Sequence, residues 1–356
     1  MRTAGTCRER EPGIDLLRCV GLFFVVSFHF FLYSGFYYEP QIGGWMLAAD
    51  SFRWLSYACN GIFMTLTGYL KSTEPLSKRY YRSLPPVLLG YALASAVSIP
   101  VRHFALGDVQ ALGTWIERFF NFRGCYYGWY VEMYIGLLLF SPVINLALRQ
   151  CRTKKQLLWL ALTMLMITAL PSVTDIPLIP DYWTSLYPIT FYVLGAVIRR
   201  LRIKLNPMLG LSLAVLISFG IGSVTFLSTD KTISDAYVQD FGTFYTTITV
   251  LCIFLSLYRL RPGPRLSKVL AWMSGGCFEG YLLSHLLDSW VYRMIPAWRT
   301  PEKYYLLFLC LAVPIYIVSI IAGKLLHTVV KALLKRKVTG SDAVREQKNA
   351  ETIPAA

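Results

Sequence analysis

The chain has 356 residues, of which 55% are apolar types and only 15% carry a charge. Ordinary globular domains hold about 25% charged residues, so the composition excludes a typical soluble domain and indicates a membrane protein. It also excludes a disordered chain, a collagen-like repeat and a small disulfide scaffold. The formal net charge of +15 would indicate a nucleic-acid partner only if the cations gathered on one soluble surface.

Ten apolar stretches follow one another along the chain when hydropathy is averaged over about 19 residues, the window suited to membrane helices. They lie near 14–36, 46–70, 84–104, 126–148, 156–171, 181–199, 207–228, 241–258, 268–291 and 303–330. Each is close to the roughly 20 residues that a helix needs to cross the hydrocarbon core. We therefore predict an all-α integral membrane protein, a bundle of about ten transmembrane helices.

The connections between these stretches alternate between many and few cations. The N-terminus, every second loop and the C-terminal end hold 26 of the 35 Lys and Arg residues, whereas the opposite loops hold seven. Cytoplasmic loops carry an excess of Lys and Arg, so both termini are predicted to be cytoplasmic and no nucleic-acid partner is expected. We divide the chain into a cytoplasmic segment at 1–13, a transmembrane domain at 14–331 and a flexible cytoplasmic tail at 332–356.

Cysteine usage and two apolar segments add further expectations. The eight cysteines include no CxxC pair and no metal-ligand spacing, so we expect neither a metal nor disulfides. The first apolar stretch lacks the cleavage pattern of a signal peptide and is expected to stay in the protein. Residues 112–122 place large apolar side chains at helical spacing, which is typical of a helix lying on the outer membrane surface.

Ionisable residues within the apolar stretches are costly and indicate function. Arg18 and His29 are eleven residues apart, and eleven steps of about 100° return a side chain to the same helix face roughly 16 Å farther along. Asp15 is expected to cap this helix and to pair with Arg18. A snorkelling arginine and a hydrogen-bonded core histidine would give the same pattern. Arg53, in the second stretch, needs a separate explanation.

The segment GIDLLRCVGLFFVVSFHF at 13–30 contains this arginine and histidine, separated by ten residues. It resembles the signature of the membrane-bound acyltransferase-3 family. Four further segments resemble motifs of that family in the same order. They are NGIFMTLTGYL at 60–70, KRYYRSLPP at 78–86, GWYVEMYIGLLLFSP at 128–142 and CFEGYLLSH at 277–285. The resemblance extends from about residue 12 to residue 330.

Two features depart from the family pattern. Many relatives carry a histidine three residues after the tyrosine of the late motif, where this chain has Ser284, with His285 one position later. A shift of one residue turns a helical side chain by about 100°, so His285 is not included in the predicted site. We also expect no hydrolase-like domain of the kind that some relatives carry, so that the membrane domain itself would meet the substrate.

The resemblance implies transfer of an acyl group, usually acetyl, from cytoplasmic acyl-CoA to a hydroxyl of a cell-envelope glycan or its lipid-linked precursor at the plasma (inner) membrane. His29 is the predicted base, because a buried neutral imidazole can accept a hydroxyl proton. Direct transfer and an acyl-histidine intermediate both stay open. Arg18, Arg79 and Arg82 are the predicted contacts of the CoA phosphates, although the topology explains Arg79 and Arg82 equally well.

Carboxylates and aromatic residues complete the predicted site. Glu132 is the second predicted catalytic residue and Glu279 a predicted substrate contact, since either carboxylate could orient an imidazole; a structural ion pair is the alternative for both. Trp129, Tyr130 and Tyr134 are predicted to stack on sugar, although aromatic residues gather at membrane interfaces without any ligand.

Two other classes of function fit parts of the sequence. A transporter or flippase of an envelope glycan precursor would also hold intramembrane charges, but no convincing repeat relates the two halves of the chain. A non-catalytic scaffold gives no reason to align Arg18 with His29. The residues favour the acyltransferase and leave open the acceptor, the acyl chain and the oligomeric state.

The cation pattern yields a test of the topology. Single cysteines at 37–44, 173–180 and 230–240 should react with a membrane-impermeant maleimide added from outside. Cysteines at 72–80 and 200–205 should react only after the membrane is opened. If both sets were labelled from the same side, fewer than ten segments would cross the membrane, which would contradict the ten-helix arrangement.

Overall fold

The computed structural model describes residues 10–173, 179–228, 241–292 and 304–351, and every regular element within them is helical. The α-helices are α1 Pro12–Tyr33, α2 Gly43–Ser56, α3 Ala58–Lys71, α4 Lys78–Tyr81, α5 Leu84–Pro100, α6 Leu112–Phe120, α7 Trp129–Gln150, α8 Lys154–Thr168, α9 Tyr187–Leu201, α10 Pro207–Ser228, α11 Phe244–Leu257, α12 Pro264–Ser274, α13 Cys277–Val291 and α14 Tyr304–Glu351. The predicted all-α class is confirmed. The predicted outer loop at 230–240, and most of the one at 173–180, lie outside the described residues.

Five helical segments are long and apolar enough to cross a membrane. They are Pro12–Tyr33, Lys78–Ala105, Tyr126–Gln150, Pro207–Leu227 and Leu306–Lys335. The other predicted stretches fall on shorter helices: α8, α9 and α11, the pair α2 and α3, and the pair α12 and α13. The helices therefore indicate a multi-pass membrane protein, while ten crossings stay a prediction.

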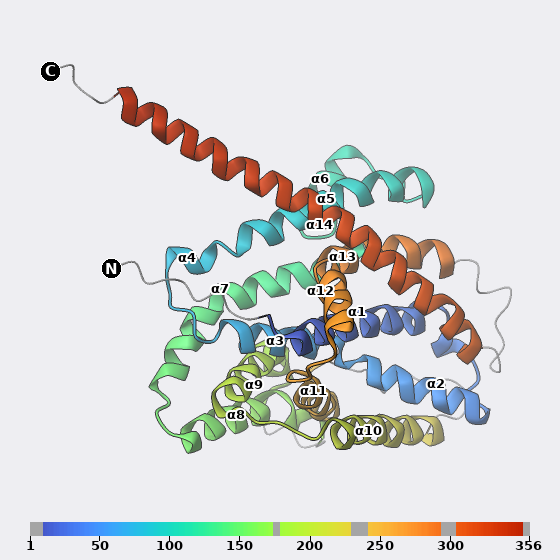
Figure 1. Cartoon of the computed structure of the whole chain (residues 1–356). Coiled ribbons are helices and arrows are strands. Elements are labelled where there is room, and N and C mark those ends of the chain that lie inside the picture. The colour runs from blue at the N-terminus through green and yellow to red at the C-terminus, as the bar shows by residue number, and fades with distance from the viewer. Residues whose placement is uncertain (1–9, 174–178, 229–240, 293–303, 352–356) are drawn as a thin grey trace.

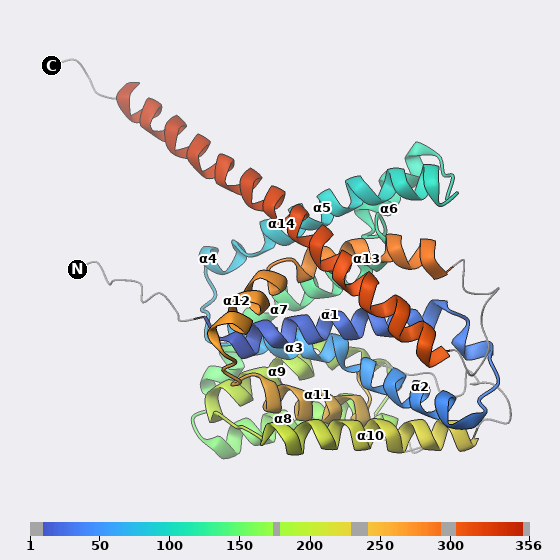
Figure 2. The same cartoon turned by 45° about the vertical axis from the view of Figure 1, so that its right-hand side comes forward.

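Helix α1 lies at the centre of the bundle (Figures 1 and 2). It begins with Pro12, which suits the first turn of a helix because the amide there has no partner within the helix. It packs against α2, α3 and α11, and also against α12, α13 and α14. Since neighbours surround the helix, its polar residues Asp15, Ser27 and His29 are buried.

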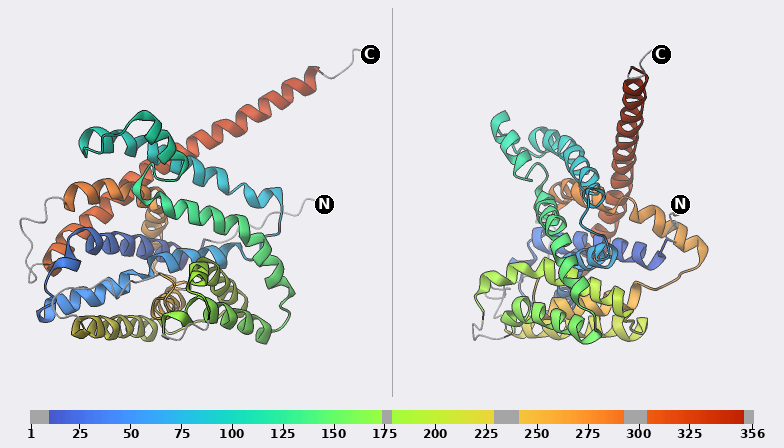
Figure 3. Two further views of the ribbon diagram at one scale, coloured as in Figure 1. Left: turned by 180° about the vertical axis from the view of Figure 1, so that it is seen from behind. Right: turned by 90° about the vertical axis from the view of Figure 1, so that its left-hand side faces the viewer.

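Helix α14 crosses the bundle and continues away from the other helices as far as Glu351 (Figure 3). Its apolar part ends at Lys335, close to the predicted boundary of the transmembrane domain at residue 331. The helix extends beyond this boundary, and the flexibility of the tail stays a prediction.

Arg53, which the sequence left unexplained, is completely buried in α2. Its Nε donates to Oδ1 of Asp50 at 2.6 Å, and both side chains are buried. The guanidinium also lies 5.1 Å from the ring of Trp54 and 5.3 Å from that of Tyr37. An ion pair and aromatic faces thus compensate a cation that would otherwise be costly in this position.

Close packing of α13 against α14 depends on glycines. A Cβ added at Gly280 of α13 would lie 2.6 Å from the carbonyl oxygen of Ser319 in α14, and one added at Gly323 would meet the carbonyl oxygen of Gly276. Small residues that let backbones approach are a common basis of helix association in membranes. This contact sets the distance between polar side chains on the two helices.

We expect Gly280→Ala to destabilise the protein by about 1–3 kcal/mol, because the obstructing atom belongs to the backbone and the helices must separate. Thermal unfolding of the detergent-purified protein measures the effect. Gly136→Ala is the matched control: nothing lies within 4 Å of its added Cβ, so the higher helix propensity of alanine should leave stability equal or slightly raised. Equal unfolding temperatures for the two variants would contradict this role of Gly280.

Candidate active site

Two cavities lie along α1, one toward each end. The first, of about 450 Å³, is lined by Arg18 and Val25 of this helix, and the second, of about 470 Å³, by Tyr33 at its C-terminal end. We call them the Arg18 cavity and the His285 cavity, after residues that line them. His29 lies between Val25 and Tyr33 in the helix and lines neither cavity itself.

The Arg18 cavity opens among cations at the N-terminal end of α1. Buried Asp15 accepts a hydrogen bond from Nε of Arg10 at 2.6 Å and from Nη1 of Arg18 at 3.2 Å. Ser274 of α12 donates to the same carboxylate at 2.6 Å. The predicted Asp15–Arg18 pair is confirmed, but Glu11 occupies the capping position, so the expectation that Asp15 caps the helix was wrong.

Lys71 of α3 also lines the Arg18 cavity, and its ammonium donates to Oγ of Ser83 at 3.3 Å. Arg79 and Arg82, two of the predicted phosphate contacts, are exposed on the neighbouring segment and do not line this cavity. The structure therefore places Lys71 in the same cavity as Arg18. Sequence reasoning missed this lysine because a cation beside a predicted cytoplasmic loop is already explained by the predicted topology.

Three of the predicted substrate contacts also line the Arg18 cavity. Tyr130 and Tyr134 of α7 stack with 6.1 Å between ring centroids, and Glu279 of α13 is buried. Oε1 of Glu279 lies 2.8 Å from Nδ1 of His327 on α14, which lines the cavity too. Sequence reasoning missed His327, although it falls within the last apolar stretch and the rule for ionisable residues in membrane spans applies to it.

His29 is buried within a stack of aromatic rings. Its imidazole is parallel to the ring of Tyr127, with 3.8 Å between centroids and 5° between planes, and Tyr33 stacks at 5.8 Å. Nδ1 of His29 is buried and has no hydrogen-bond partner among the described residues. A core histidine held by hydrogen bonds does not describe this atom, although His29 lines neither of the two cavities.

Tyr127 connects His29 with two ionisable residues of α13. Its hydroxyl donates to Oδ2 of Asp288 at 2.6 Å, and its ring meets the imidazole of His285 edge-on at 5.6 Å. Asp288 and His285 are buried, and both line the His285 cavity. Sequence reasoning set His285 aside because of its register and missed Tyr127 and Asp288, although the acidic residue falls within a predicted span.

A layer of aromatic rings separates the two cavities. Tyr281 lines the Arg18 cavity and Tyr127 lines the His285 cavity. The hydroxyl of Tyr281 donates to the carbonyl oxygen of Tyr127 at 2.8 Å, and the two rings stack at 5.7 Å. His29, the predicted base, packs on Tyr127 of this layer.

Glu132 and Trp129 lie apart from this arrangement. Both are exposed and line neither cavity, and Trp129 stacks on Phe241 at 6.1 Å. They are three residues apart and share one face of α7, whereas Tyr130 and Tyr134, four apart, share another. The sequence identified the helix but not which of its faces points inward.

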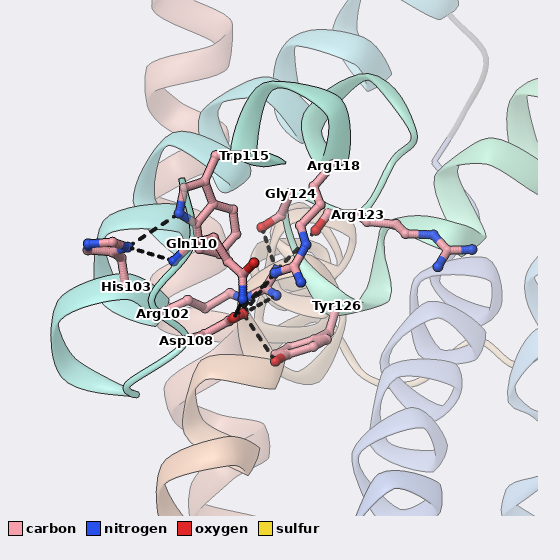
Figure 4. Close-up of polar contacts among 9 residues, drawn as sticks. All are labelled: Arg102, His103, Asp108, Gln110, Trp115, Arg118, Arg123, Gly124 and Tyr126. Carbon is pink, nitrogen blue, oxygen red and sulfur yellow. Dashed lines mark hydrogen bonds and ion pairs between the residues drawn. The ribbon is translucent and has the colours of Figure 1, made fainter. Parts of the chain in front are cut away.

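Next to the His285 cavity, a charged cluster holds the turn that carries Tyr126 (Figure 4). Asp108 binds Nη2 of Arg102 at 2.6 Å and Nη1 of Arg118 at 3.1 Å. The guanidinium of Arg102 also lies 3.8 Å from the ring centroid of Tyr126 and donates to the carbonyl oxygen of Gly124 at 3.1 Å. Arg102 thereby ties the loop that carries Asp108 to one wall of the cavity.

A comparison with known protein families identifies the family of the chain. The profile of the acyltransferase-3 family, described as an acyltransferase domain, matches residues 11–324, so the chain belongs to this family and is an acyltransferase. The resemblance inferred from the five motifs is thus confirmed. No curated protein and no solved structure matches the chain. Within the described residues, no group of three or more His, Cys, Asp or Glu side chains is arranged to hold a metal ion.

The ion pairs of Asp108 make the charged cluster sensitive to acid. Burial alone would raise the pKa of this carboxyl, but hydrogen bonds from Arg102, Gln110 and Arg118 and the charge of Arg102 hold the pKa below its usual value. A carboxyl whose pKa is lowered by folding stabilises the fold above its unfolded value, near pH 4, and this contribution is lost as pH falls through the folded value.

We therefore expect Asp108→Asn to lower stability at pH 7 by about 1–3 kcal/mol, since two guanidinium groups lose their carboxylate. The variant should also lose less stability than the wild type between about pH 5 and pH 3. Thermal unfolding across this range measures both effects. Glu117→Gln, at an exposed position on α6, is the control and should follow the wild-type profile. A wild-type profile for Asp108→Asn would contradict the assignment.

Proposed function

We propose that this acyltransferase moves an acyl group, acetyl in the simplest case, from cytoplasmic acyl-CoA in the Arg18 cavity to a hydroxyl of a cell-envelope glycan or its lipid-linked precursor. The order of groups along α1 carries the proposal: cations at the N-terminal end, a cavity beside the middle, and then His29. In this proposal the ten apolar stretches cross the plasma (inner) membrane with both termini in the cytoplasm.

The mouth of the Arg18 cavity suits the phosphates of CoA. The side chains of Arg10 and Arg18 are anchored on a buried carboxylate yet stay 59% and 35% exposed, so N–H groups remain for a phosphate. Lys71 adds a third cation to the lining. Arg79 and Arg82 are exposed on the adjacent segment and raise the positive potential that attracts an anionic donor.

The rest of the Arg18 cavity suits the long arm of the donor. Beyond the cations the lining includes Val25, Phe63, Leu66 and Phe278. Arg18 and His29 are roughly 16 Å apart along the helix, a distance that a pantetheine arm can span. The volume of about 450 Å³ falls within the usual range of ligand sites, about 300–1,000 Å³.

His29 acts as the general base in this mechanism. It takes the proton of the acceptor hydroxyl as the hydroxyl oxygen forms a C–O bond to the acyl carbon and the C–S bond breaks. The imidazolium then gives this proton to the departing sulfur, which leaves an ester, a CoA thiol and neutral histidine. An acyl-histidine route would use the same residue with a different order of bond formation.

Neighbouring residues position the base and the donor. Tyr127 packs against the imidazole, and Asp288 fixes Tyr127 through the hydrogen bond of 2.6 Å; both are positioning residues. We assign Glu279, Tyr130 and Tyr134 to contacts with the donor, because they line the Arg18 cavity. Exposed Glu132 and Trp129 have no part in this mechanism.

The proposal predicts that donor binding and chemistry can be separated by mutation. His29→Gln should lower single-turnover acetyl transfer by about 100-fold or more, because glutamine cannot accept the proton, while acetyl-CoA binding is retained. Arg18→Gln should weaken acetyl-CoA binding by about tenfold or more, because a charge-assisted hydrogen bond is lost. Equilibrium binding of acetyl-CoA and single-turnover transfer, measured on the same purified proteins, test both parts.

Arg265→Gln is the matched control, since Arg265 is an exposed cation on α12 that lines neither cavity. It should bind acetyl-CoA and transfer acetyl as the wild type does. Near-normal transfer by folded, donor-bound His29→Gln would end the general-base assignment. An unchanged affinity of Arg18→Gln for acetyl-CoA would contradict binding of the donor in the Arg18 cavity.

A further inference from the structure

The His285 cavity has a wall chemistry unlike that of the Arg18 cavity. Its lining consists of four tyrosines, a histidine, an aspartate and a serine: Tyr33, Tyr126, Tyr127, Tyr292, His285, Asp288 and Ser289. Lys and Arg are missing from this lining of described residues, whereas three cations line the other cavity. The two cavities therefore suit ligands of different charge.

Polar atoms in and beside the His285 cavity lack partners within the described part of the chain. They are Nε2 of His285, Oδ1 of Asp288 and Nδ1 of His29, all buried. A buried polar atom without a partner costs about 1–3 kcal/mol, so such atoms gathered in one place indicate a ligand that supplies hydrogen bonds. A histidine nitrogen and a carboxylate oxygen both accept hydrogen bonds from hydroxyl groups.

Aromatic faces complete the wall. Tyr33 and Tyr126 line the cavity with about half of their surface exposed, 49% and 51%. Arg102 covers one face of Tyr126 and fixes the orientation of the ring. Aromatic rings present apolar faces, while the hydroxyls of tyrosine offer hydrogen bonds at the ring edge, a combination that matches the apolar faces and polar rim of a sugar ring.

We propose that the His285 cavity binds an uncharged sugar ring of the acceptor and excludes sugars that carry a carboxylate or phosphate. This inference rests on the proposed function and adds where the acceptor binds and that its bound sugar is uncharged. An anionic sugar would lose its water beside the buried Asp288 carboxyl, and no Lys or Arg in the described lining would compensate the charge of the sugar.

The reacting hydroxyl reaches His29 from the side opposite the donor. It gives its proton to the imidazole, its oxygen forms the ester bond to the acyl carbon, and the C–S bond breaks. The same proton then passes to the sulfur of CoA. His285 contacts the sugar, whereas Asp288 both contacts it and holds Tyr127 against the base.

Photolabelling of the full-length protein in lipid nanodiscs tests the acceptor site. The probes are diazirine-bearing methyl glycosides: a glucoside and an N-acetylglucosaminide, both uncharged, and a glucuronide, which adds a carboxylate. We expect at least one uncharged probe to label peptides that contain residues 126–127 or 285–292, about tenfold or more above the glucuronide. Methyl glucoside and dodecyl glucoside are then compared as competitors of the labelling. Stronger competition by methyl glucoside indicates a polymer end as the acceptor, and stronger competition by dodecyl glucoside indicates a lipid-linked acceptor.

Two variants control the labelling. Ser289→Trp fills the His285 cavity and should abolish labelling by the uncharged probes while acetyl-CoA binding is retained, which shows that the variant is folded. Thr163→Trp, at an exposed position on α8 outside both cavities, should label as the wild type does. Absence of labelling by both uncharged probes, equal labelling by the glucuronide, or undiminished labelling of Ser289→Trp would overturn the proposal.

The outcomes also separate this proposal from the proposed function. If Ser289→Trp still transfers acetyl at the wild-type rate, the acceptor does not use this cavity, but the donor and the base stand. If labelling follows the expected pattern while His29→Gln keeps normal transfer, the sugar site stands and the assigned base fails.

Discussion

An ionisable side chain inside an apolar bundle is stable only where a partner, a cavity or an aromatic face offsets the loss of water. Helix α1 concentrates these compensations. Asp15 holds two guanidinium groups at one end of the helix, and stacked tyrosines enclose His29 near the other. The buried pair of Asp50 and Arg53 in α2 shows the same constraint met purely by structure. The ionisable residues of α1 differ from this pair because two cavities lie along α1.

The packing of α13 and α14 against α1 gives the site its second half. Glycine contacts bring these helices together closely enough for Glu279 to reach His327. Along α13, Glu279 and Tyr281 line the Arg18 cavity. Farther along the same helix, His285 and Asp288 line the His285 cavity. A single helix thus contributes to both compartments, and the aromatic layer at Tyr281 and Tyr127 keeps them apart.

Much of the fold was predictable because membrane helices are recognised from one-dimensional hydropathy. The shared face of Arg18 and His29 was predictable for a similar reason, since it depends on the helical period alone. Residues brought in by other helices were not predictable in this way. Tyr127 reaches His29 through a contact between distant parts of the chain, and the inward face of α7, which carries Tyr130 rather than Glu132, depends on packing. A cation at the predicted cytoplasmic side can reflect either topology or phosphate binding, so the sequence did not single out Lys71.

In the proposed mechanism, acyl-CoA enters the Arg18 cavity and directs its acyl group toward His29. The most direct test is an experimental structure of the protein with a non-hydrolysable acetyl-CoA analogue. We predict phosphate density beside Arg10, Arg18 and Lys71, and the acyl end near Tyr281 on the approach to His29. Phosphates bound at Arg79 and Arg82 with the arm outside the Arg18 cavity, or an analogue seated in the His285 cavity, would contradict the account.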